Sequence, residues 1–582
     1  MADITADRAH LRLPTKVREG QAPTSDRRPL EARRLPVGSS VLLFMLNTMH
    51  PAALRSAPTV VEVHSESPGR PIRAPLVVTA LGTGLFLLLR LPVSDLQAAT
   101  VRADAVDRGV GPTYWFSWFG GSTPGRYSVI TPWISHLTGA PVIAACAVLA
   151  VVFLTGQLLA GFRYQLSATS LVALTALANL WSGRVAFCLG AAFALAGIMF
   201  LRRGLDWAAG TFNVIAVLAS PLAGAFVLLA TSGLLFTGTA WRTAVWRQTL
   251  MSGFALLLLA AIFGVPGPTP FDRITAVKVF VALLVLQLVR LPRHVRIGLL
   301  IATVLCVGCY FLPIGLGGNL SRYALFVAPP VVWAFSSSPR RFVCLAVAPA
   351  VVYAAGLTAI DVQAATQASA RSGYYGSLRA ALSRQAGLAS YRVEALDTPT
   401  HRSSAEVSRY ANLARGWDLQ ADVSANPLFY GGRPLTPMSY RLWLDELAVA
   451  WVAVPDDLNA HNRAEAALIA SGLPYLTETW HDRHWTLYSV RDAQPIVSAP
   501  ATVVSSSPAA LLVNVPKSAT VALRIRSSPY LRVAPVDGQP AKAQLSRRGA
   551  LQVALTVDRP GVYSISGAFS FSGLLSALGA GR

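Results

Sequence analysis

The segment LPVSDLQAATVRADAVDRGVGPTYWFSWFGGSTPGRYSVITPWISHLTGA, residues 91–140, lies between two long apolar runs. It is polar, rich in aromatic residues and interrupted by glycine and proline. It also carries an acid, Asp95, a few residues after the first apolar run ends. Functional groups are often carried by loops that a rigid scaffold positions. The sequence therefore predicts a scaffold that holds this loop at a membrane surface, with Asp95 as the candidate catalytic carboxylate.

The composition is that of a membrane protein. Of the 582 residues, 53% are hydrophobic and only 13% are charged, whereas about 25% are charged in ordinary globular domains. The formal net charge is +22, but most basic residues fall in the N-terminal tail and in short loops, where the positive-inside rule accounts for them. Nucleic acid is therefore not expected as a partner. The five cysteines lie in apolar runs, which indicates neither a disulfide framework nor a zinc site.

Apolar runs long enough to cross a bilayer begin after residue 73. Residues 1–73 are rich in arginine and proline, and we expect a disordered, basic, cytoplasmic N-terminus. Residues 74–361 are expected to form the transmembrane domain, with residues 92–139 as its first outer loop. About 11 spans are predicted. They lie near residues 75–91, 140–160, 167–182, 185–201, 206–220, 222–238, 249–265, 275–290, 296–314, 322–337 and 342–360. The turn ASPLAG, residues 219–224, is compatible with either a tight turn or a re-entrant helix.

The arginine-bearing loops predict the orientation. Five alternate loops each carry arginine: GFRYQ, FLRRG, AWRTAVWRQ, RLPRHVR and SSSPRR. The positive-inside rule places them in the cytoplasm together with the N-terminus. The Asp95 loop and everything after Asp361 then lie on the outer side of the plasma membrane.

The chain after residue 361 has the composition of a soluble region. Residues 362–498 alternate helical and strand patterns, which predicts an extracytoplasmic α/β domain. Residues 499–582 show alternating strands and are expected to form an extracytoplasmic β-rich domain. The predicted fold class is thus an α-helical polytopic membrane protein followed by a soluble α/β plus β-sandwich outer domain. Residues 362–570 are expected to fold as an independent water-soluble unit.

Cations at the predicted outer ends of spans are the main candidates for substrate binding. The positive-inside rule does not explain Arg184, Arg273, Lys278 and Arg322, and arginine suits a phosphate or pyrophosphate. The alternative is that each caps a helix end and extends to the headgroups. Asn319 joins the substrate-binding candidates, since it lies in the glycine-rich turn GLGGNLSR.

The first outer loop supplies aromatic candidates. Tyr114, Trp118 and Tyr127 belong to a dense aromatic cluster that either anchors the chain at the interface or offers a platform for sugar rings and lipid chains. The alternative to a catalytic role for Asp95 is a structural one, in which its side chain caps the N-terminus of a helix that begins near Leu96. Asp418, in LARGWD, is compatible with glycan binding or with helix packing.

These features resemble the GT-C-type integral-membrane glycosyltransferases. The resemblance rests on the acid that opens the first outer loop, on the aromatic segment WFSWFGG, and on LWSGRVAFCLG, LASPLAG, GGNLSRYALFVAPP and NPLFYGG. It implies that Asp95 acts as general base or binds the acceptor. It also implies that a polyprenyl-phosphate sugar donor is held by outer-face cations, here Arg184, Arg273 and Arg322. Many relatives place a second acid or a histidine beside the first, whereas Leu96 and Gln97 follow here. No metal ligands are therefore assigned, and a divalent cation stays possible.

The function that follows is a membrane glycosyltransferase for cell-envelope glycan assembly. Its expected partners are a lipid-linked sugar donor, a glycan or lipid acceptor, and membrane lipids. Two alternatives remain open at this point. One is a multi-pass transporter or flippase of envelope lipids or glycans, which would be expected to show related halves. The other is a non-catalytic envelope scaffold.

Overall fold

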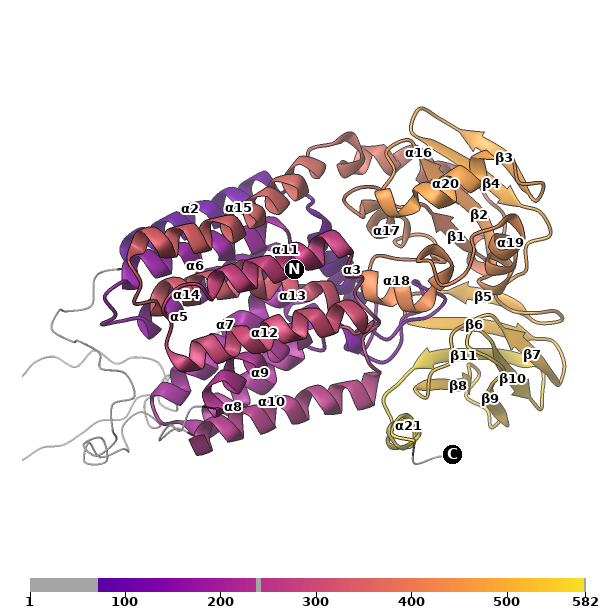
Figure 1. The fold of residues 1–582 in the computed structure, drawn as a ribbon. Coiled ribbons are helices and arrows are strands. Elements are labelled where there is room, and N and C mark those ends of the chain that lie inside the picture. The colour runs from indigo at the N-terminus through magenta and orange to yellow at the C-terminus, as the bar shows by residue number, and fades with distance from the viewer. Residues whose placement is uncertain (1–71, 237–241, 580–582) are drawn as a thin grey trace, which may run out of the picture. The chain divides into compact units, whose positions relative to one another are not determined.

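The structure is a computed structural model that describes residues 72–236 and 242–579 (Figure 1). All of the described residues belong to one compact unit, residues 60–582. The predicted disordered segment 1–73 lies almost entirely outside the described residues.

The first part of the described chain is a helical bundle (Figure 1). Most of its helices consist of alanine, leucine, valine and phenylalanine, and they begin or end at proline, glycine or arginine. Their bounds are α2 (Arg73–Leu89), α3 (Ser94–Asp107), α4 (Thr131–Thr138), α5 (Ala140–Leu158), α6 (Gln165–Trp181), α7 (Val185–Arg202), α8 (Asp206–Ala219), α9 (Pro221–Leu235), α10 (Arg242–Phe263), α11 (Arg273–Leu286), α12 (Arg293–Phe311), α13 (Leu320–Arg322), α14 (Ala328–Phe335) and α15 (Arg340–Ala364).

Five helices in the described ranges are long and apolar enough to cross a membrane: α5, α7, α10, α12 and α15. A sixth candidate arises if α2 and α3, which are bent by 68° relative to each other, count as one broken span. Each of the 11 predicted spans overlaps a helical segment, but the count of about 11 is not confirmed. The apolar windows in the sequence include turn residues. Without them, the 14 residues of α8 extend only about 21 Å, less than the roughly 30 Å of a hydrocarbon core.

The segment ASPLAG forms a tight turn between two short helices. Ser220 has extended backbone angles, and its side chain accepts a hydrogen bond from the Ala223 N–H at the start of α9. Gly224 lies so close to Val217 that an added Cβ would be 2.4 Å from that side chain. The helices α8 and α9 therefore pack directly against each other on either side of Ser220.

The arginine-bearing loops gather at one end of the bundle. The Arg340 guanidinium lies over the Tyr164 ring, and the Ser337 N–H donates to the Arg290 carbonyl at 3.1 Å. Arg202 donates to the carbonyl of Leu158, and Arg247 forms an ion pair with Asp206 at 3.0 Å. Each of the five loops thus contacts another of them or the end of a neighbouring helix. The first loop, residues 92–139, and the turns at Gly183, Gly267 and Gly315 lie at the opposite end, where they contact one another and the C-terminal part.

The C-terminal part contains three sheets. The first is mixed, with the order β1-β2-β4-β3 and a parallel β1–β2 pair; the other two are antiparallel, with the orders β7-β10-β9 and β5-β6-β11-β8. The strands are β1 (Arg392–Ala395), β2 (Val449–Pro455), β3 (Leu476–His481), β4 (Trp485–Val490), β5 (Thr502–Ser506), β6 (Ala510–Val515), β7 (Ala519–Leu523), β8 (Leu531–Pro535), β9 (Ala543–Arg547), β10 (Val553–Val557) and β11 (Gly561–Gly567). The helices are α16 (Gly376–Ser383), α17 (Arg402–Val407), α18 (Leu419–Ala425), α19 (Pro437–Glu446), α20 (Arg463–Ala470) and α21 (Phe571–Ala577).

The aromatic segment 113–122 of the first loop is embedded in this C-terminal part. Its backbone forms hydrogen bonds with Leu413, Pro508 and Arg526, at 2.8–2.9 Å. Its aromatic side chains are buried in two C-terminal cores, one beneath the mixed sheet and one between the antiparallel sheets. Those cores are therefore completed by residues from the first loop. Residues 362–570 expressed alone would lack these aromatic side chains. Their folding as an independent unit stays a prediction.

Candidate active site

A cavity of about 330 Å³ lies where the bundle meets the C-terminal part. Its charged lining consists of four arginines and two aspartates, an excess of two positive charges: Arg102, Arg126, Arg184, Arg322, Asp95 and Asp418. Apolar side chains from α7, α9 and the loop before α13 complete the wall: Phe187, Leu222, Ala225 and Leu316. An excess of guanidinium groups beside an apolar wall suits an anionic, amphipathic ligand.

Asp95 lies between two arginines in this cavity. Its Oδ2 is 3.4 Å from Arg322 Nη2 and 3.8 Å from Arg184 Nε. All three side chains are mostly buried, with 27% of Asp95, 23% of Arg322 and 13% of Arg184 exposed. Both ion pairs use the same carboxylate oxygen. Asp95 also lines the cavity, so its carboxylate lies beside the space that a ligand would occupy.

The interpretation of Asp95 as an N-cap is wrong. Helix α3 begins at Ser94 with Val93 at the N-cap position, and no side chain caps it. Asp95 is the second residue of the helix and lies on the same face as Ala98 and Arg102, which also line the cavity. The spacing i, i+3, i+7 brings these residues to one side of a helix.

A buried ion pair joins the first loop to the C-terminal part across the cavity. Arg102 Nη2 and Asp418 Oδ2 are 2.7 Å apart. The Arg102 guanidinium also lies 4.1 Å from the centre of the Tyr127 ring and 5.7 Å from that of Trp118. Burial raises the pKa of the Tyr127 hydroxyl, although Arg102 opposes this shift. Tyr127 thus lines the cavity, whereas Trp118 supports Arg102.

Residues Trp417 to Gln420 of the C-terminal part form the outer wall of the cavity. The Gln420 side-chain amide donates to the carbonyls of Gly267, at 3.1 Å, and Gly315, at 2.8 Å. An added Cβ on Gly267 would be 1.9 Å from the Gln420 carbonyl oxygen, so this close approach requires glycine there. The wall is therefore bonded to two turns at the end of the bundle.

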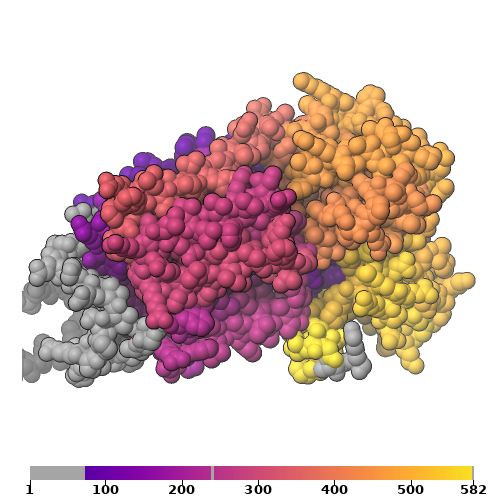
Figure 2. Space-filling model, viewed as in Figure 1, coloured from indigo at the N-terminus to yellow at the C-terminus, as the bar shows by residue number. Residues whose placement is uncertain are grey.

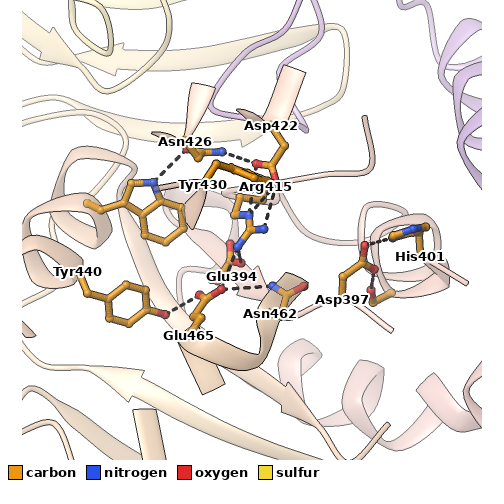
Figure 3. Close-up of polar contacts among 12 residues, drawn as sticks. Glu394, Asp397, His401, Arg415, Asp422, Asn426, Tyr430, Tyr440, Asn462 and Glu465 are labelled. Carbon is orange, nitrogen blue, oxygen red and sulfur yellow. Dashed lines mark hydrogen bonds and ion pairs between the residues drawn. The ribbon is translucent and has the colours of Figure 1, made fainter. Parts of the chain in front are cut away.

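A buried ion cluster holds this wall (Figure 3). Arg415 lies 2.9 Å from Asp422, 2.8 Å from Glu465 and 3.5 Å from Glu394. Four further side chains donate hydrogen bonds to the carboxylates, at 2.6–3.2 Å: Tyr430, Asn426, Tyr440 and Asn462. Burial and the neighbouring Glu465 raise the pKa of Glu394 well above its usual range. Since Arg415 and Asp422 flank residues 417–420, the cluster fixes the position of the wall.

Trp417 lies between this cluster and the cavity. It lines the large cavity and also a smaller one of about 20 Å³ within the C-terminal part. Its ring stacks on His401 with an angle of 7° between the planes, and His401 in turn pairs with Asp397. The stack supports one side of the indole and leaves part of it in the large cavity.

The structure brings together five of the predicted site residues and leaves four elsewhere. Those at the cavity are Asp95, Arg184, Arg322, Asn319 and Tyr127. Asn319 donates to Thr269 Oγ1 at 2.9 Å.

The other four predicted residues do not line this cavity. Arg273 is exposed at the first turn of α11, and Lys278 is exposed beside the Tyr353 ring. Tyr114 and Trp118 are buried in the C-terminal cores.

The lining residues that the sequence did not reveal include three with charged or polar side chains and one aromatic residue: Arg102, Arg126, Gln420 and Trp417. The signal for Arg102 was its helical spacing from Asp95. Arg126 donates to the carbonyl of Phe263 at 3.3 Å, and burial lowers the pKa of its guanidinium. In the described residues no group of three or more His, Cys, Asp or Glu could hold a metal ion.

No protein-family model matches this chain, and no curated protein matches it. Among solved structures, it is similar to the cryo-EM structure of the arabinofuranosyltransferase AftD from mycobacteria, at 13% sequence identity and a TM-score of 0.41. The similarity covers 88% of this chain and 58% of that one, so this chain spans little more than half of that protein. At this level of similarity the match assigns neither a substrate nor a residue role to this chain.

Proposed function

We propose that this protein is a membrane glycosyltransferase that uses a polyprenyl-phosphate-linked sugar at the outer face of the cytoplasmic membrane for cell-envelope glycan assembly. The observation that carries the proposal is the position of Asp95. It is a carboxylate held between two arginines, in a cavity with an excess of positive charge and one apolar wall.

The cations and the apolar wall suit the proposed donor. Arg184 and Arg322 are placed to hold the phosphate, because guanidinium groups bind phosphate oxygens through paired hydrogen bonds. The apolar residues of α7 and α9 would accompany the first part of the lipid chain. The hairpin of α8 and α9 supports this arrangement, since its turn at Ser220 lines the same cavity.

The outer wall would hold the acceptor glycan. Trp417 offers an aromatic face, and Asp418 and Gln420 offer polar groups beside it. In the proposed reaction, an acceptor hydroxyl approaches Asp95 Oδ1 and gives up its proton as its oxygen attacks the anomeric carbon. The bond between that carbon and the phosphate oxygen breaks, and the two arginines stabilise the phosphate that leaves. A single displacement of this kind inverts the anomeric configuration.

The substitution Asp95→Asn tests the proposal. Asparagine keeps the shape of the side chain but accepts no proton, so turnover should fall by about 10²–10⁴-fold. Donor affinity should be kept or rise, because the removed charge repels phosphate. The measurement is sugar transfer by the full chain in lipid nanodiscs, from a panel of polyprenyl-phosphate pentoses and hexoses to envelope oligosaccharides.

Asp107→Asn is the matched control. Asp107 ends the same helix with 72% of its side chain exposed and does not line the cavity, so this variant should keep wild-type turnover. Wild-type turnover by a folded Asp95→Asn protein would refute the catalytic role. Movement of the lipid donor across vesicles without any transfer would favour the transporter instead.

A further inference from the structure

The helix α21, last among the described elements, is followed and accompanied by exposed apolar side chains. Phe571, Leu575 and Leu578 are 73%, 38% and 50% exposed. Their spacing, i, i+4 and i+7, places them on one face of the helix. Phe569, just before the helix, is 57% exposed. Figure 2 shows this helix, in yellow, at the surface of the molecule.

The structure fixes α21 at the end of a candidate membrane span. Helix α21 contacts α10, and the Tyr530 hydroxyl donates to the carbonyl of Ile262, in the last turn of α10, at 2.9 Å. Gly573 lies against Tyr530, where an added Cβ would be 2.9 Å from the ring. The Tyr530 ring also stacks on Phe569. Tyr530 therefore contacts both α21 and the last turn of α10, so that α21 lies beside the end of α10 (Figure 1).

Helix α10, which α21 contacts, also carries a row of exposed apolar side chains. Along α10, Leu250, Phe254 and Leu257 are 63%, 67% and 73% exposed at the same i, i+4, i+7 spacing. A helix that crosses a bilayer faces lipid with such a row. Just beyond the end of α10, Val265 is also 70% exposed.

A cation lies at the start of α21. Arg532 donates hydrogen bonds to Ser570 and Ser572. Arginine beside an exposed apolar helix face is typical of a segment that lies in the lipid headgroup layer, where the guanidinium meets phosphate and the apolar side chains enter the acyl boundary.

We propose that α21 is an interfacial anchor. Its apolar face is buried in the membrane leaflet that contains the Phe263 end of α10. The helix thereby holds the C-terminal part at the membrane surface. The proposed occupant of the face is phospholipid. The proposal does not depend on the chemistry of the cavity, because α21 contributes no lining residue there.

Fluorescence quenching in the full chain tests this inference. The background replaces the exposed Cys146 and Cys344 with serine and keeps the three buried cysteines. Leu575→Cys or Leu578→Cys then carries an environment-sensitive fluorophore in phosphatidylcholine–phosphatidylglycerol nanodiscs. Lipids with a nitroxide near the headgroup should quench both labels strongly. A label at Leu257→Cys on α10 should be quenched by lipid nitroxides as well and serves as the positive control. Dissolved iodide should quench neither label on α21.

The matched control is Leu442→Cys on α19. Leu442 is also an exposed apolar residue, at 56%, but it lies on the C-terminal part away from the bundle, so iodide should quench its label and the nitroxide lipids should not. Quenching of positions 575 and 578 by iodide would overturn the proposal. Shielding of both positions from iodide and nitroxide alike would also overturn it, because a protein surface would then cover the face. A monodisperse elution profile for each labelled protein shows that the variants are folded.

Discussion

Replacing Arg415 with methionine tests whether the buried ion cluster holds the outer wall of the cavity. In the described part of the chain, Arg415 makes all the ion pairs of Glu394, Asp422 and Glu465. Methionine fills much of the same space without a charge, so three buried carboxyl groups lose their counter-ion. Removal of one partner from a buried ion pair costs about 3–5 kcal/mol. In a region of about 200 residues, each kcal/mol lowers the melting temperature by roughly 2–4 °C, so we expect a decrease of about 6–20 °C.

The assay is thermal unfolding of the full chain in detergent, followed by tryptophan fluorescence. Arg409→Met is the control, because Arg409 is half-exposed and pairs with Glu406 and Asp104 at 3.2 and 3.4 Å. Exposed pairs of this kind contribute about 0–1 kcal/mol. A variant that combines Arg415→Met with Glu394→Gln and Glu465→Gln should recover part of the lost stability, since only the carboxyl group of Asp422 is then buried without a counter-ion. If Arg415→Met lowers the melting temperature no more than Arg409→Met does, the cluster does not hold the wall.

Three further predictions concern the same protein. Because the pKa of Glu394 is raised in the folded state, its contribution to stability is complete below about pH 4.3, the usual pKa of glutamate, and is lost as pH rises toward the raised value. The melting temperature of the wild type should therefore fall relative to that of Glu394→Gln between pH 5 and pH 8, and a constant difference would contradict this. Arg322→Lys should raise the KM for the donor, and Arg322→Gln should raise it further, because lysine keeps the charge but loses the paired geometry; an unchanged KM would place the phosphate elsewhere. A reporter active only outside the cell should be active after Ala370 and silent after Arg203 or Arg340, and the reverse at two of these sites would contradict the orientation.

Sequence reasoning located the cavity residues that could be recognised from their own surroundings. Asp95 is an acid that opens a loop after an apolar run, and Arg184 and Arg322 are cations that the positive-inside rule does not explain. In the structure, both arginines lie within 3.8 Å of Asp95. The same rule selected Arg273 and Lys278, which are exposed. The rule concerns the side of the membrane on which a charge lies and not the side of the helix to which it points.

The rest of the site depends on contacts between distant parts of the chain. Trp417 and Gln420 line the cavity because the ion cluster around Arg415 and the close approach at Gly267 hold them there. These contacts join residues far apart in the sequence, so no local sequence pattern predicts them. The loop aromatics were misleading for the same reason. Tyr114 and Trp118 have the density expected of a binding platform or an interface belt, but they are core residues of a region whose strands come hundreds of residues later. Strand order was equally inaccessible, since alternating patterns predict strands but not which strands pair.

The burial of segment 113–122 in the C-terminal cores has a consequence for the order of events during synthesis. The ribosome makes Trp115 and Trp118 long before Leu413, Pro508 and Arg526, with which their segment later bonds. Until then the aromatic side chains have no core, and the strands that follow cannot complete theirs without them. Contacts of such long range form slowly and late. A nascent or truncated chain therefore lacks the wall of the cavity, and the site assembles only after the last strands have been made.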